Sequence, residues 1–328
     1  MMKKTIALLL ASAMALTLVA CSKKEKTKQP EKSQEPEQSA QDENTPIEGE
    51  DYTTGDAALD KPRNEDGIGQ QELLVVSFGT SYNDSRRNTI GAIEQAMEDN
   101  FQDWSVRRAF TSQIIIDRVA KRDAVTIDNV GQALERAVNN QVKTLVVQPT
   151  HLMNGLEYEE LMDELAKYAD AFDKVVVGEP LLTSDEDFQN LMGAITEDTS
   201  EYDDGETAIV FMGHGTEADS NAVYAKMQTV LADAGLDNYF IGTVEATPSL
   251  DDVLAAVGKG QYKRVVLQPL MIVAGDHANN DMAGDEEDSW KTAFTKAGYQ
   301  VECRLRGLGE IEAVQQMLVD HAAAAMAK

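Results

Sequence analysis

The chain has 328 residues and a formal net charge of −28, with 29 basic and 57 acidic side chains. Because nucleic-acid binding needs a clustered basic face, this balance argues against a nucleic-acid partner. The acidity suits a soluble surface and a protein that handles cations, and the length allows one large domain or two smaller ones.

The N-terminus is organised like a bacterial export signal. Lys3 and Lys4 form a basic start, an apolar stretch spans 5–20, and Cys21 follows the letters LVA. The stretch is too short for a comfortable transmembrane span, and its end resembles a lipobox. We predict that residues 1–21 are a lipoprotein signal peptide and that Cys21 is lipidated, which places the protein outside the cytoplasm, anchored to a membrane. The alternative is an ordinary signal peptide with a chance cysteine.

Residues 22–70 contain almost no large apolar side chain and are rich in Lys, Glu, Gln, Pro, Ser and Asp. Such a segment cannot bury enough surface to offset its chain entropy, so a disordered, charged tether is expected. If Cys21 is lipidated, Cys303 is the remaining thiol and no internal disulfide can form. Cys303 lies in a strand-like run and is expected to be a small buried residue.

From residue 72 onward, short apolar runs alternate with amphipathic stretches, which is typical of βα units around a parallel sheet. We predict an α/β fold of two similar doubly wound lobes, residues 71–200 and 201–328. The strands are expected at 72–78, 105–110, 143–149, 174–180, 207–213, 239–245, 263–270 and 300–305. Helical periodicity is clearest at 88–100, 156–170 and 221–235.

Local motifs recur in the two halves, which indicates an internal duplication. The run SFGT at 77–80 corresponds to GHGT at 213–216, and VVQP at 146–149 corresponds to VLQP at 266–269. A glycine stands six residues after the proline in both halves. Two such lobes are expected to face each other, and a cleft between them is the default ligand site.

The duplication is broken at two histidines. His214 is matched by Phe78 and His277 by Glu157, so both imidazoles belong to one half only. Both follow predicted strands, Glu245 ends the predicted strand 239–245, and strand ends are where α/β proteins build their sites. Two imidazoles and a carboxylate suit Zn, Co, Ni or Fe. Taken singly, either histidine also fits an ordinary surface or core position.

Six runs in the folded part carry a family resemblance that extends from residue 72 to the C-terminus. They are VVSFGTS, RRAFTSQIII, VVQPTHLMNGLEYE, FMGHGT, GTVEATPS and QPLMIVAGDHANNDMAGD. In this order they resemble the anaerobic-type sirohydrochlorin cobaltochelatases, class II tetrapyrrole chelatases with a ferrochelatase-like two-lobed fold. The resemblance implies that His214, Glu245 and His277 form the metal site.

The implied reaction is the insertion of a divalent metal into sirohydrochlorin for cobalamin biosynthesis, with Co²⁺ as the first expectation and Fe²⁺ or Ni²⁺ as alternatives. The ring must lose two N–H protons, so we assign the base role and a ligand role to His214. His277 is expected to act mainly as a ligand, and Glu245 as a charge-balancing ligand or second proton acceptor. The chain has no Walker-type loop, which predicts insertion without a nucleotide.

Sirohydrochlorin carries eight carboxylates, so the resemblance requires donors and positive charge in the first half. Backbone amides between a strand and a helix can bind an anion, and arginines can pair with carboxylates, Arg87 and Arg108 being further candidates. A histidine at a strand end would line the cleft, whereas His321 in the last helix is expected to be solvated. The predicted substrate-binding residues are Gly79, Thr80, Ser81, Arg86, Arg107 and His151.

The export signal supports different functions. Cobalamin and sirohaem precursors are normally made in the cytoplasm, so a lipoprotein outside the cell could instead capture haem, a related tetrapyrrole or a metal ion for uptake. A simple divalent-metal-binding lipoprotein is a third interpretation, although it leaves the large cleft unexplained. Assembly into a homo-oligomer is left open, because periodicity does not identify exposed helices that pair.

Overall fold

The structure is a computed structural model and describes residues 55–328. The predicted signal peptide, Cys21 and the tether up to residue 54 lie outside the described residues. Within residues 55–328, none of the helices combines the length and apolar character that crossing a membrane requires.

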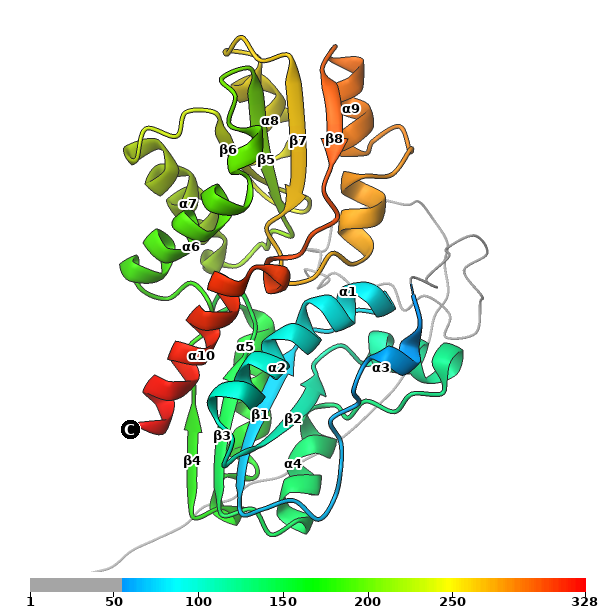
Figure 1. Cartoon of the computed structure of the whole chain (residues 1–328), viewed down its shortest axis with the longest axis vertical. Helices are drawn as coiled ribbons and strands as arrows, with labels where there is room; N and C mark the ends of the chain where they lie inside the picture. Colours follow the sequence, from blue (N-terminus) through cyan, green and yellow to red (C-terminus); the bar gives the residue numbers. More distant parts are fainter. Residues whose placement is uncertain (1–54) are drawn as a thin grey trace, which may run out of the picture. The chain divides into compact units, whose positions relative to one another are not determined.

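Each half of the chain builds one four-stranded parallel sheet (Figure 1). The first sheet has the order β2-β1-β3-β4 and the second the order β6-β5-β7-β8, which confirms the predicted α/β fold class. The strands are β1 Gln71–Ser77, β2 Ser105–Phe110, β3 Thr144–Pro149, β4 Lys174–Val177, β5 Thr207–Gly213, β6 Tyr239–Thr243, β7 Arg264–Pro269 and β8 Gln300–Cys303. All were expected within a few residues of these bounds, and most of them are the continuous apolar runs typical of buried parallel strands, β2 and β8 being the exceptions.

The pairing register is the same in both sheets. Val75 of β1 lies opposite Gln148 of β3, and Phe211 of β5 lies opposite Gln268 of β7. This equivalence places Phe78 and His214 at the same position, directly after the first strand of each sheet. The sheets therefore repeat one topology, as the motif correspondence indicates.

The described residues form ten α-helices, of which α1 to α9 lie between strands and α10 follows the last strand. Several begin at capping boxes, among them α4, where Asn129 and Gln132 bond each other's backbone, and α8, where Ser249 and Asp252 do so. The helices are α1 Asn83–Asn88, α2 Ile90–Asn100, α3 Gln113–Asp123, α4 Val130–Asn139, α5 Leu156–Ala166, α6 Asp185–Asp198, α7 Ala222–Asp233, α8 Leu250–Val257, α9 Trp290–Lys296 and α10 Glu312–Met326.

Helices cross between the two halves. The C-terminal helix α10 follows β8 in the chain but packs on β3 and β4 of the first sheet, whereas α6 follows β4 and contacts α7 (Figure 1). His321 on α10 takes part in this contact: its Nε2 lies 2.9 Å from Asp187 Oδ1, and its Nδ1 lies 3.1 Å from the carbonyl oxygen of Glu179. The expectation that His321 is solvated is therefore wrong, because periodicity does not show which elements a helix crosses.

The segment 55–70 is ordered and packed on the first sheet. It contains a short 3₁₀ helix, Ala57–Leu59, followed by Asp60, which is only 9% exposed. The Asp60 carboxylate lies 2.7 Å from Arg86 Nε and 2.6 Å from Arg108 Nη1, two guanidinium groups without solvent exposure. The predicted disorder is thus wrong for residues 55–70. The segment has too few large apolar side chains to form a core of its own, but buried ion pairs anchor it to the rest of the fold.

Candidate metal centre

His214 follows β5 directly and is held between two glycines that the packing requires. A Cβ on Gly213 would lie 2.1 Å from Cε1 of Tyr224. Gly215 has a φ of +90°, and a Cβ there would lie 2.8 Å from the backbone nitrogen of Ala246. The hydroxyl of Tyr224 accepts a hydrogen bond from the Gly215 N–H. The glycines therefore let the loop fold tightly under His214, whose side chain stays 46% exposed.

Glu245 reaches the same place from the neighbouring strand. It stands two residues after the end of β6, and its backbone N–H donates to the carbonyl oxygen of His214 at 2.9 Å. This bond continues the strand pairing past the sheet edge. The carboxylate Oε2 lies 3.8 Å from His214 Nδ1, and the Glu245 side chain is 55% exposed.

His277 arrives from the loop after β7 and precedes a π-helical turn, Ala278–Met282. Its Nδ1 lies 2.8 Å from Asp281 Oδ2. The hydrogen bond to Asp281 raises the pKa of His277, with burial acting in the opposite direction. Its side chain is 32% exposed, so an ion can reach the ring.

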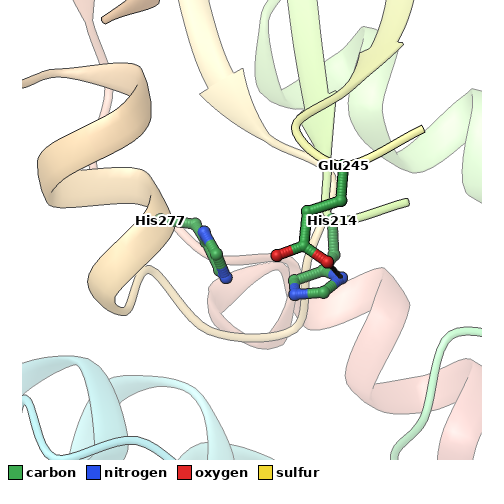
Figure 2. Close-up of side chains that lie close together, drawn as sticks. All are labelled: His214, Glu245 and His277. Atoms are coloured by element: carbon green, nitrogen blue, oxygen red, sulfur yellow. Dashed lines mark ion pairs between the residues drawn. The ribbon is translucent and has the colours of Figure 1, made fainter. Parts of the chain in front are cut away.

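The three side chains converge (Figure 2). One ligand atom from each of His214, Glu245 and His277 lies within 4.8 Å of the others. The two imidazole rings meet edge to face, with centroids 4.6 Å apart and planes at 82°. Two nitrogens and one oxygen form a donor set for a borderline divalent ion and leave coordination positions for water or a substrate, as in catalytic sites. The structure thus brings the whole predicted metal set together.

The loop Gly79–Ser81 lies against the loop that carries His277. A Cβ on Gly275 would stand 3.2 Å from Thr80 Oγ1, and the Ala274 N–H donates to Ser85 Oγ at 3.0 Å. The side chains of Thr80 and Ser81 are buried. These residues therefore connect the first half to the metal-site loop, while their predicted contact with substrate stays a prediction.

Arg86 and Arg107 are not available for substrate carboxylates. Arg86 has no solvent exposure and donates to Asp60 and to Asn83 Oδ1 at 2.7 Å. Arg107 is 4% exposed and donates to the carbonyl oxygens of Arg63 and Glu65. Their predicted role is wrong, because their donors hold segment 55–70 on the first sheet.

The two further arginine candidates, Arg87 and Arg108, differ from each other in solvent exposure. Arg108 is 1% exposed and pairs with Glu94 and Asp60, so it belongs to the buried network. Arg87 pairs with Asp84 at the surface, at 2.9 Å, and keeps 32% of its side chain exposed.

His151 follows β3, and both of its ring nitrogens are buried without a hydrogen-bond partner among the described residues. Burial lowers the pKa of His151 to about 4, so the ring is neutral at pH 7. The prediction that it lines the substrate site stays a prediction. As an uncharged imidazole it could contact a ring face but could not neutralise a carboxylate.

Sequence reasoning missed Asp281 and did not assign a role to Phe78. Asp281 stands four residues after His277, a spacing that places two helical side chains on one face and could have identified it. Phe78 lies directly after β1, at the position equivalent to His214, and its side chain is 48% exposed. Two cavities within residues 55–328 flank α10, and neither is lined by the three metal-site residues.

Comparisons with known proteins identify the family of the chain. The model of the cobalt chelatase (CbiK) family matches residues 71–327. The sirohydrochlorin cobaltochelatase of Salmonella typhimurium is 37% identical over 252 residues, which cover 77% of this chain and 95% of that protein. The sirohydrochlorin cobaltochelatase CbiKC of Nitratidesulfovibrio vulgaris is 30% identical over 268 residues, covering 81% and 94%.

A solved structure shows the same fold at much lower sequence similarity. SirB from Bacillus subtilis, determined with Fe³⁺, aligns with a TM-score of 0.56 and 14% identity, covering 78% of this chain and 96% of its own. With the family model spanning nearly all of the described residues, this chain belongs to the CbiK family of cobalt chelatases.

Proposed function

We propose that this protein inserts Co²⁺ into sirohydrochlorin without a nucleotide. The observation that carries the proposal is the convergence of His214, Glu245 and His277 within 4.8 Å at the ends of three parallel strands or the loops that follow them. The names of the two relatives give the substrate class. Fe²⁺ and Ni²⁺ suit the same donors, since availability decides among ions that one site can hold.

The tautomer of His214 supports its two roles. Its Nδ1 lies 2.8 Å from the Gly215 carbonyl oxygen, which can only accept, so Nδ1 carries the hydrogen. Nε2 then offers a lone pair. Insertion releases two protons for each ion taken up by the ring. When the ion leaves Nε2 for the ring nitrogens, that lone pair can accept one pyrrole proton, and the Glu245 carboxylate can accept the other.

Exposed apolar side chains of the first half suit a macrocycle. Phe78, which is 48% exposed, follows β1. Leu156, which is 59% exposed, follows the loop after β3. Phe78 is two residues before Thr80, which adjoins the His277 loop. Gly155 stands beside Leu156, and a Cβ on it would lie 3.7 Å from Oγ of Ser220 in the segment after His214. We propose that these side chains contact the tetrapyrrole face opposite the metal ligands.

Capture of a tetrapyrrole or metal outside the cell is the second candidate. The N-terminal sequence, with Lys3, Lys4 and Cys21, favours it, because it predicts a lipid-anchored protein outside the cytoplasm. In that case the same three ligands would hold an ion or a metallated ring without inserting the metal. Homo-oligomer formation also stays a prediction.

Purified protein incubated with sirohydrochlorin and Co²⁺ tests the proposal. The absorption spectrum should change to that of the cobalt complex much faster than in the absence of protein. His214→Ala should lower the rate by about 10²- to 10⁴-fold, the range for loss of a general base, while His321→Gln, a histidine substitution away from the site, should retain it. An uncatalysed rate together with tight binding in a parallel haem titration would favour capture instead, and full activity of His214→Ala would remove the assigned base.

A further inference from the structure

His277 has one ring nitrogen engaged within the protein and one left for an ion. Nδ1 lies 2.8 Å from Asp281 Oδ2. Because an ionised carboxylate can only accept hydrogen bonds, Nδ1 carries the hydrogen in the neutral ring. Nε2 then presents the lone pair that a metal requires. We propose that Asp281 is a positioning residue, which fixes the ring orientation and tautomer of His277 so that Co²⁺ binds through Nε2.

The turn that carries Asp281 is anchored in the core. It is the π-helical turn Ala278–Met282, whose first and last residues have no solvent exposure and pack in the cluster that includes Trp290. A Cβ on Gly284 would lie 2.3 Å from the Asn280 carbonyl oxygen, so the chain leaves the turn at a point where only glycine fits. Such π turns are frequent at functional sites. The geometry thus holds Asp281 over His277 independently of any ion.

Asp281 differs from the neighbouring acid of the same loop. The Asp276 carboxylate accepts from Asn280 Nδ2 at 2.9 Å, whereas the carboxylate bonded to the His277 ring is that of Asp281. Asp281 is also separate from the three residues whose ligand atoms converge. Its action on the ion therefore passes through His277, and Asp276 provides a matched comparison of equal charge.

The chemical consequence is on metal affinity. A carboxylate that accepts the hydrogen of one imidazole nitrogen orients the ring and makes the other nitrogen a better ligand, and its loss typically weakens metal binding by about 10- to 100-fold. The inference rests on the proposed metal site, since it requires His277 to be a ligand.

Direct titration of the purified full chain with Co²⁺, followed by the visible absorption of the bound ion, tests this role without sirohydrochlorin. Asp281→Ala should weaken Co²⁺ binding by about 10- to 100-fold with an unchanged thermal unfolding midpoint. Asp281→Asn, whose amide oxygen can still accept from Nδ1, should recover most of the affinity and the wild-type spectrum. Asp276→Ala should stay within about threefold of the wild type, because it leaves the His277 bond in place.

Wild-type Co²⁺ affinity of Asp281→Ala would overturn the inference. Equal losses of affinity in Asp281→Ala and Asp281→Asn, or in Asp281→Ala and Asp276→Ala, would also overturn it, because the loss of a negative charge alone would then explain the weaker binding. His277→Ala separates this outcome from failure of the metal site. If His277→Ala binds Co²⁺ normally, the proposed site is wrong. If it loses binding while Asp281→Ala does not, only the positioning role is wrong.

Discussion

Desolvation dominates the pKa of two ionisable side chains, the buried Glu72 and His151, whose ring nitrogens are both buried. Burial raises the pKa of Glu72 to about 7, although Arg107 and Arg136 oppose the shift. Burial lowers the pKa of His151 to about 4. In both residues the uncharged form is favoured, because a low-dielectric surrounding penalises charge of either sign. The sequence identifies neither residue as perturbed, since the effect comes from the surrounding chain.

The Glu72 carboxyl should make stability depend on pH. Its folded pKa lies above its ordinary value, so its contribution is fully present below about pH 4.5 and is lost as the pH rises through about 7. Relative to the wild type, Glu72→Gln should therefore gain up to about 3 kcal/mol of unfolding free energy between pH 5 and pH 8. Urea unfolding at both pH values measures this. The exposed substitution Glu201→Gln is the control, and an equal effect of Glu72→Gln at the two pH values would contradict the expectation.

At the scale of elements, the loops after β5, β6 and β7 position the three proposed metal ligands. The His214 loop depends on Gly215, whose φ of +90° and contact with Ala246 exclude a side chain. The Glu245 loop continues the pairing of β6 with β5, and the His277 loop ends in the π-helical turn Ala278–Met282. The ends of the strands in the sequence predict where these loops begin. They do not predict the hydrogen bonds that orient the side chains of the loops.

Gly215→Ala should disturb the centre through the backbone. The positive φ and the 2.8 Å approach to the Ala246 nitrogen together should cost about 2 to 4 kcal/mol and displace His214. Gly235→Ala is the matched control: it has a φ of +77° but nothing within 4 Å of its Cβ, so only the backbone strain of about 1 kcal/mol applies. Chemical denaturation and Co²⁺ titration of both variants check this. Equal losses in the two variants would show that the contact at Gly215 has no effect.

At the scale of the whole described chain, two connections cross the boundaries that the sequence suggests. Helix α10 returns from the second half to the first sheet, and segment 55–70 is held there by the buried Asp60, Arg86, Arg108 and Glu94 network. Large apolar residues from both sheets and α10 belong to one core cluster. The second half, which carries the proposed metal ligands, is therefore supported by the first through shared packing.

Asp60→Ala should destabilise the whole fold. It removes the acceptor of Arg86 Nε and of two Arg108 donors and leaves buried positive charge, a change that typically costs about 3 to 5 kcal/mol. Lys61→Ala next to it removes an exposed pair with Glu98 and should cost about 1 kcal/mol or less. Urea unfolding of both variants gives the comparison. A loss below about 1 kcal/mol for Asp60→Ala would mean that the segment is only loosely attached.

The sequence by itself determined the strands, the duplication and the three proposed metal ligands, because most buried parallel strands are continuous apolar runs and these side chains stand near the strand ends. Only the tertiary structure decided which partners the arginines bind and whether segment 55–70 is ordered. The sequence is the same whether Arg86 and Arg107 contact a substrate, or donate to a buried aspartate and to backbone carbonyl oxygens respectively as they do here, and only packing selects the partner. The sequence positions of the proposed ligands were local information, whereas the contacts of their side chains, such as that of His277 with Asp281, required the folded chain.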